Sequence, residues 1–250
     1  MIFEVEKQHF DQHGFVIVRQ LLGSPDFAEL NENLDRYIRD VVPQLADADA
    51  FYQDRARPET LKQLQRMDCD PFFLNYMQNP KWTALAQALV GEPVTVYQPE
   101  WFNKPPGTNH VTPPHQDNYY FCQAPSNVVT IWLALDLVDA ENGCLRYVAG
   151  SHQRGYRTHA KSQILGFSQG ITDYSHEDFT REVAIPLQPG DAVAHHGMTI
   201  HRADANLSLT RHRRSFAMVF KGASCQRDEA AYARYLAAAR DQHQELGLKT

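Results

Sequence analysis

The chain has 250 residues, 43% of them hydrophobic, so it can bury a core and its length fits one domain over 1–250. Its 24 Lys and Arg against 30 Asp and Glu give a formal charge of −6, which argues against nucleic acid as a partner. We also expect no membrane association, because no apolar run approaches the roughly 18 residues of a spanning helix and residues 1–10 are too charged for a signal peptide.

Four cysteines are scattered along the chain without a C-x-x-C pair. This pattern is typical of free thiols in a reducing compartment, so we expect a cytoplasmic protein. The cysteines are Cys69, Cys122, Cys144 and Cys225.

Residues 1–93 are predicted to be mainly helical and to support the rest of the fold. Ser24 has the features of a helix N-cap and is followed by proline, and Asn79 begins a second helix in the same way. Gly91 ends that second helix. We expect both helices to cover the outer face of a larger sheet. The predicted elements are a strand over 14–18 and helices over 24–42 and 80–90.

From residue 94 the chain changes to strands separated by proline and glycine, which predicts a β-core over 94–222. In the strand that begins at Val94, alternate residues share a face, and the face of interest carries a glutamine, a glutamate and a lysine. A second strand is predicted over 128–138. Its Thr130, Trp132 and Ala134 lie on one side, and the alternate residues lie on the other. The shared face of the first strand comprises Gln98, Glu100, Phe102 and Lys104.

A long polar segment, 153–182, interrupts the core, and segments of this length inside a compact domain are often lids. Its first part is basic and includes Arg154 and Arg157. An alanine-rich terminal helix over 228–246 shows no evident site.

Two short motifs, PPHQD and HHGMTIH, supply two histidines and a carboxylate, and an arginine cluster follows. His115 and Asp117 are two residues apart, so both can reach one metal from an extended segment. Two imidazoles and one carboxylate bind one face of an octahedral iron(II) and leave room for a 2-oxo acid and O2. Arginine matches the distal carboxylate of 2-oxoglutarate. The expected metal ligands are His115, Asp117 and His201, and Arg213 is the expected anchor.

Other histidines remain second choices as ligands. His195 and His196 precede His201 on the approach to the strand, from which their side chains can face the cavity. His152 follows a Gly-Ser turn, where a hydrogen bond to the loop is the simpler role. A His-x-Asp pair alone is a weak signal, so the interpretation depends on the joint pattern. That pattern favours a double-stranded β-helix, also called a jelly roll or cupin-like fold, with ligands on neighbouring strands at one mouth of the barrel and α-helices at its flanks.

The same segments resemble the phytanoyl-CoA dioxygenase (PhyH) family of iron(II)- and 2-oxoglutarate-dependent oxygenases. The resemblance runs from about residue 10 to 222 and includes DQHGFVIV, FNKPPG, PPHQD, ENGCLRYVAGSH and RRSF. It places Trp132 against 2-oxoglutarate, with Thr130 and Lys104 nearby as further co-substrate residues. The spacing after Asn206 departs from the family by one residue, so Arg213 is the preferred anchor and Arg214 the alternative.

The resemblance implies a hydroxylase that uses Fe(II), 2-oxoglutarate and O2 and releases succinate and CO2. Halogenating relatives replace the carboxylate of this motif with a small residue, so the intact Asp117 favours hydroxylation. We expect a small polar, anionic metabolite as substrate, bound by aromatic walls, an amide and a basic lid. The predicted substrate residues are Gln98, Tyr119, Phe121, Arg154 and Arg157.

Three alternatives stay open. One is an acyl-CoA hydroxylase of the same family. Another is a cupin-like metal enzyme that does not use 2-oxoglutarate, although such proteins typically carry His-x-His and a glutamate. The third is a catalytically silent binding protein on the same scaffold. The sequence makes no prediction of oligomeric state.

Overall fold

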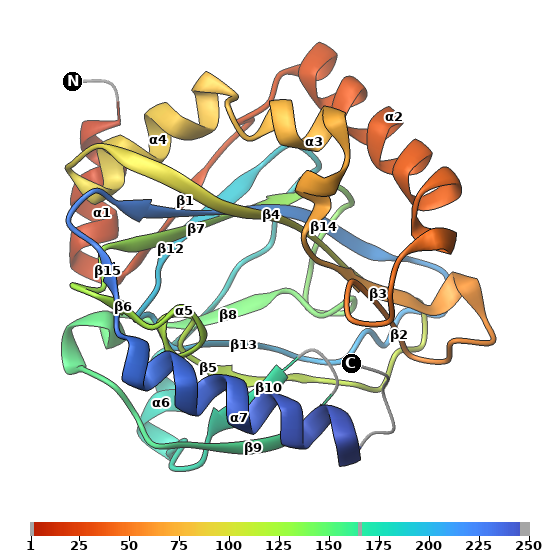
Figure 1. Cartoon of the computed structure of the whole chain (residues 1–250). Coiled ribbons are helices and arrows are strands. Elements are labelled where there is room, and N and C mark those ends of the chain that lie inside the picture. The colour runs from red at the N-terminus through yellow and green to blue at the C-terminus, as the bar shows by residue number, and fades with distance from the viewer. Residues whose placement is uncertain (1–2, 165–166, 246–250) are drawn as a thin grey trace.

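The computed structural model describes residues 3–164 and 167–245. Its centre is a double-stranded β-helix, in which a larger and a smaller antiparallel sheet face each other (Figure 1). The larger sheet has, in spatial order, β1 (Phe15–Val18), β12 (Ala192–His196), β7 (Val128–Ala134), β14 (Arg213–Gly222), β4 (Val94–Lys104), β3 (Leu61–Leu64) and β2 (Ala50–Tyr52). The smaller sheet has β11 (Glu182–Ala184), β8 (Leu145–Val148), β13 (His201–Ala203) and β5 (Thr112–His115).

Helices from the first 90 residues cover the outer face of the larger sheet, as the sequence predicts (Figure 1). Leu30, Leu34 and Tyr37 recur at helical spacing and are buried against that face. Trp82 adds the largest fully buried side chain there. These helices are α1 (Glu4–His13), α2 (Ser24–Asp40), α3 (Pro71–Tyr76) and α4 (Pro80–Val90), and short 3₁₀ turns lie at η1 (Val42–Gln44), η2 (Pro58–Thr60) and η3 (Met67–Cys69).

The ends of these helices match the sequence signals in part. Asn79 caps α4 by accepting a hydrogen bond from the Lys81 amide, and Gly91 ends the helix with φ +83°. Ser24 is not the N-cap of α2: Gly23 takes that position, without a side-chain hydrogen bond, and Ser24 becomes the first helical residue. The mainly helical region also contains β2 and β3, which extend the larger sheet beside β4.

Strand β7 is buried on both faces and divides the interior. Trp132 and Ala134 pack with the cluster between the two sheets, whereas Ile131 and Leu133 pack with the helices. The predicted strand over 128–138 is too long, because it ends at Ala134. Beyond that point Asp136 binds Arg214 instead of continuing the ladder.

The predicted lid, 153–182, consists mostly of regular secondary structure. Its residues 165–166 lie outside the described residues. It begins inside η4 (Ser151–Arg154) and contains a hairpin of β9 (His159–Ile164) and β10 (Phe167–Ile171). It also contains helix α6 (His176–Thr180), whose N-terminus is capped by Ser175. The hairpin lies against β5 and the terminal helix α7 (Glu229–Glu245), drawn in blue in Figure 1. Residue 246 of the predicted helix is also outside the described part. The remaining elements are α5 (Asn118–Phe121) and the paired strands β6 (Gln123–Ala124) and β15 (Gln226–Arg227).

Within the residues that the structure describes, no helix combines the length and apolar character needed to cross a bilayer.

Candidate metal centre

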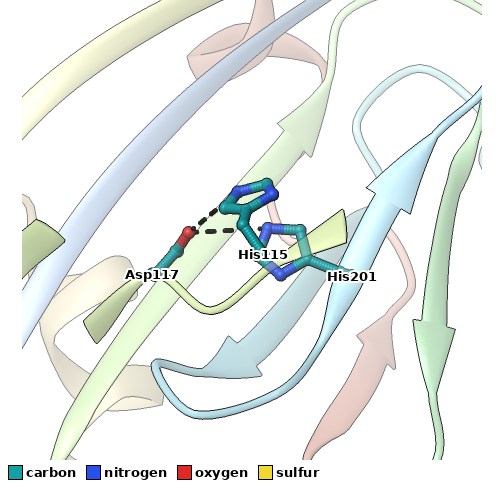
Figure 2. A group of neighbouring side chains, drawn as sticks. All are labelled: His115, Asp117 and His201. Atoms are coloured by element: carbon teal, nitrogen blue, oxygen red, sulfur yellow. Dashed lines mark ion pairs between the residues drawn. The ribbon is translucent and has the colours of Figure 1, made fainter. Parts of the chain in front are cut away.

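The fold brings together the three residues that the sequence nominates as metal ligands. His115 ends β5, His201 begins β13, and the two are direct partners across the antiparallel pair. Asp117 follows two residues after His115. One ligand atom from each of the three residues lies within 4.8 Å of the others, and Figure 2 shows the side chains converging. Both histidines are buried, and the Asp117 side chain is 13% exposed.

Backbone carbonyls fix the orientation of both imidazole rings. The Nδ1 of His115 lies 2.8 Å from the carbonyl oxygen of Pro113, and the Nδ1 of His201 lies 3.0 Å from that of Thr199. If each Nδ1–H donates to its carbonyl, each Nε2 is the metal-binding atom. These Nε2 atoms lie 3.4 and 3.5 Å from Oδ1 of Asp117. Burial, together with the neighbouring His115, holds the pKa of His201 well below its ordinary value, which favours the neutral form that binds metals.

The second carboxylate oxygen of Asp117 is held by two side chains. Thr130 donates its hydroxyl to Oδ2 at 2.7 Å, and Nε2 of His195 lies 2.9 Å from the same oxygen. Tyr147 in turn lies 2.9 Å from Nδ1 of His195. Burial alone would raise the pKa of Asp117, but the neighbouring histidines, His201 first, hold it well below the ordinary value. The arrangement keeps Asp117 ionised with Oδ1 directed at the histidines.

Arg213 faces the same cavity from β14, where it lies opposite Lys104 of β4. The guanidinium is buried, 5.3 Å from the centre of the Trp132 ring, and its Nε has no hydrogen-bond partner among the described residues. Burial lowers the pKa of Arg213 to about 10, so the group stays charged at neutral pH. A buried, charged donor without an acidic partner fits the carboxylate of a bound organic acid.

The neighbours of Arg213 have defined partners. Arg214 forms an ion pair with Asp136 at 2.8 Å and does not line the cavity. Lys104 is buried and donates to the backbone carbonyls of His110 and Asp204. Thr130 uses its hydroxyl on Asp117, whereas the Nε of Arg213 is a buried donor without a partner among the described residues.

The cavity that contains this centre has a volume of about 420 Å³. Of the predicted substrate residues, Gln98 and Phe121 line it. Tyr119 does not, because Asn118–Phe121 is a single helical turn and not a strand, so the alternation that we expected fails. Tyr119 stacks on His159 at 3.9 Å, and Tyr120 takes its place in the cavity wall.

The two lid arginines also lie away from the described cavity wall. Arg154 pairs with Glu177 at 3.7 Å, and Arg157 pairs with Asp173 and Asp178, each at 3.1 Å. Their charges are therefore offset by acids of the same segment, so the prediction that these arginines bind the substrate is not supported.

Of the second-choice histidines, His195 supports Asp117 and the other two lie apart from the cluster. His196 accepts a hydrogen bond from the Met198 amide, and His152 contacts the carbonyl of Asp11. The terminal helix, in which we expected no site, contributes Tyr232, Tyr235 and Leu236 to the cavity. The aromatic residues at helical spacing on α7 were a signal that this helix could form part of a cavity wall.

Comparisons with known proteins agree with the geometry. The peroxisomal phytanoyl-CoA dioxygenase of Bos taurus is 25% identical over 234 residues, which cover 88% of this chain and 68% of that protein. The structure of EvdO2 from Micromonospora carbonacea var. aurantiaca, complexed with 2-oxoglutarate, is 26% identical, with a TM-score of 0.71 over 90% of this chain and 92% of that one. The epimerase SnoN, in complex with Fe³⁺, alpha ketoglutarate and nogalamycin RO, is 21% identical and shares the fold, with a TM-score of 0.72 over 90% of this chain and 85% of that one.

The family model described as phytanoyl-CoA dioxygenase (PhyH) matches residues 10–215, which include all three metal-ligand candidates and Arg213. The chain belongs to the phytanoyl-CoA dioxygenase family.

Proposed function

We propose that the chain uses iron(II), 2-oxoglutarate and O2 to hydroxylate a small polar metabolite, with release of succinate and CO2. The observation that carries the proposal is the buried Arg213 guanidinium, which has no acidic partner in the described residues and lies in the same cavity as the His115, Asp117 and His201 cluster. The cluster fits a hard divalent metal with open positions, and the guanidinium fits the distal carboxylate of a 2-oxo acid.

Each residue of the centre then has a defined task. His115, Asp117 and His201 would hold the iron, and Arg213, which lies over the Trp132 ring, would hold the distal carboxylate of 2-oxoglutarate. Bound iron, with 2-oxoglutarate and O2, supplies the oxidising chemistry that breaks a substrate C–H bond. His195 and Thr130 keep Asp117 oriented. The intact Asp117 supports hydroxylation as the outcome, because halogenating relatives have a small residue in place of this carboxylate.

The cavity lining supports a small polar substrate. Five of the described lining side chains lack a polar atom, and the others carry at least one, which supports a small polar substrate over a long acyl chain. Our expectation of an anionic substrate rested on Arg154 and Arg157, which are paired with acids, and it is not part of the proposal. The five apolar side chains are Phe102, Val111, Phe121, Leu145 and Leu236.

Acyl-CoA hydroxylation is the second candidate, favoured by the name of the Bos taurus relative. Succinate formation separates the two: we expect stimulation by small polar metabolites and none by acyl-CoAs. The opposite result would replace the proposed substrate class and leave the co-substrates unchanged.

An anaerobic titration tests the co-substrates directly. Fe(II) and 2-oxoglutarate added together to the full chain should give a weak visible charge-transfer band, which Fe(II) alone does not give. A cupin-like enzyme without 2-oxoglutarate, or a silent binding protein, would show no such band, and that result would overturn the proposal.

We also propose a cytoplasmic location. The four cysteines are free thiols, which supports a reducing compartment.

A further inference from the structure

One end of the cavity contains a buried carboxyl group that the proposed chemistry does not use. Glu100 lies on β4 and is 8% exposed. The amide of Gln98 donates to its Oε1 at 2.7 Å, and no basic side chain of the described residues forms an ion pair with it. Burial first, and the nearby Asp117 second, raise the pKa of Glu100 to about 8. A buried carboxyl group in this situation gains from a cationic partner.

Aromatic rings from three elements line the same end. Tyr97 and Phe121 lie 5.6 Å apart between ring centres, and Tyr120 and Tyr235 lie 5.7 Å apart. Tyr232 also lines the cavity, but the Arg227 guanidinium already lies over its ring at 4.3 Å and would repel a second cation there.

A β-bulge explains how Tyr97 reaches this wall. In the pairing with β14, Gln98 lies opposite Val219 and Val96 lies opposite Phe220, so Tyr97 is an extra residue on β4. In a regular strand, adjacent side chains point to opposite faces of the sheet, whereas a bulge allows two adjacent side chains to point to the same face. Both Tyr97 and Gln98 therefore line the cavity.

We propose that this end of the cavity binds a positively charged ammonium group of the substrate, through the Glu100 carboxylate and the rings of Tyr97, Tyr120, Phe121 and Tyr235. Aromatic faces attract cations. A bound ammonium group also favours the ionised form of Glu100, which then supplies a full negative charge. The opposite end carries Arg213 and Lys104, which repel an ammonium group and suit the carboxylates of 2-oxoglutarate. The inference rests on the proposed function, because it assigns an orientation to the substrate of that same site.

The test uses pairs of probes that differ in charge and little in shape. Choline is compared with 3,3-dimethylbutan-1-ol, and n-butylammonium with butan-1-ol, by isothermal titration and ligand-observed NMR on the full chain. We expect at least one cation to bind about tenfold more tightly than its neutral counterpart. Glu100→Gln keeps the shape and removes the charge, so it should abolish the preference. Glu177→Gln, at an exposed acid outside the cavity, should leave it unchanged.

A pair of variants at Tyr235 provides a second measurement that does not alter the buried carboxyl group. Tyr235→Leu should weaken cation binding by about threefold to tenfold, whereas Tyr235→Phe keeps the ring and should retain it. Equal binding within both probe pairs, binding of no probe, or a preference that survives Glu100→Gln would overturn the inference. These titrations need neither iron nor 2-oxoglutarate, so their failure is distinct from the absence of the charge-transfer band.

Discussion

His195 lies with its Nε2 2.9 Å from Oδ2 of Asp117, while Oδ1 of the same carboxylate faces His115 and His201. The two oxygens therefore have different tasks: one is directed at the metal position and the other is anchored to the protein. Because Tyr147 lies within hydrogen-bond distance of Nδ1 of His195, the ring is fixed at both nitrogens. Partners of this kind orient a metal ligand without touching the metal.

The first prediction concerns this support. His195→Ala should reduce iron(II) affinity by about 10- to 100-fold while the far-ultraviolet circular dichroism stays the same, because Asp117 loses one of its two anchors. His195→Gln, which can still donate to Asp117, should recover part of the affinity. Anaerobic equilibrium dialysis with Fe(II) measures both. Unchanged affinity in His195→Ala would show that Thr130 alone holds the carboxylate.

The second prediction concerns the ligands themselves. Single replacement of His115, Asp117 or His201 by Ala should abolish turnover and leave iron binding too weak to measure at micromolar protein. Folding should change little, because these side chains contribute to the cavity wall and not to the main apolar core. His196→Ala is the matched control, since it removes a neighbouring histidine that lies apart from the cluster. Normal iron affinity in His201→Ala, combined with its loss in His196→Ala, would contradict the assignment.

The sequence predicted the fold class and the convergence of the three ligand candidates because both depend on strong local patterns. The extended segment that the His-x-Asp pair predicts is present as β5, which ends at His115. The alternation in 128–134 correctly assigns the residues of β7 to the two faces of the sheet. Spacing alone could not show that His201 lies directly opposite His115, since 86 residues and several strands separate them.

The failures have physical causes as well. Tyr119 was assigned to the pocket by strand alternation, but the chain turns into a helix directly after Asp117, and one helical turn changes which side chain faces inward. The bulge at Tyr97 likewise has no signature in the sequence, because it arises from pairing with β14. The role of the terminal helix was missed because its alanine-rich composition is typical of a surface helix, although Tyr232 and Tyr235 lie at helical spacing on one face.

The third prediction separates the two adjacent arginines. Arg213→Ala should raise the 2-oxoglutarate concentration needed for half-maximal turnover by 30-fold or more, because loss of a buried charge-assisted pair costs about 2 to 5 kcal/mol. Iron affinity should change little. Arg214→Ala should have the opposite profile, with a normal 2-oxoglutarate requirement and a lower melting temperature, because it leaves Asp136 unpaired. A large effect on the 2-oxoglutarate requirement at Arg214 would shift the assignment by one residue.

The fourth prediction concerns acid stability and His196. Burial first, and then the nearby His152, lower the pKa of His196 from 6.5 to about 4. In addition, Nδ1 accepts the Met198 amide at 3.0 Å, so protonation of that nitrogen would break a hydrogen bond. The unfolded chain takes up this proton near pH 6.5 and the folded chain only near pH 4. The unfolded state therefore binds more protons between these values, and acidification favours unfolding.

His196 should thus contribute stability that is fully present above pH 6.5 and lost as the pH falls to about 4, by up to about 3 kcal/mol. His196→Asn retains an acceptor for the Met198 amide and removes the titrating ring. Its melting temperature should fall less steeply than that of the wild type between pH 6.5 and 4, as measured by differential scanning calorimetry. His176→Asn, at an exposed histidine, is the control and should follow the wild type. Parallel curves for the wild type and His196→Asn would show that acid sensitivity originates elsewhere, for example at His159, whose pKa burial also lowers to about 4.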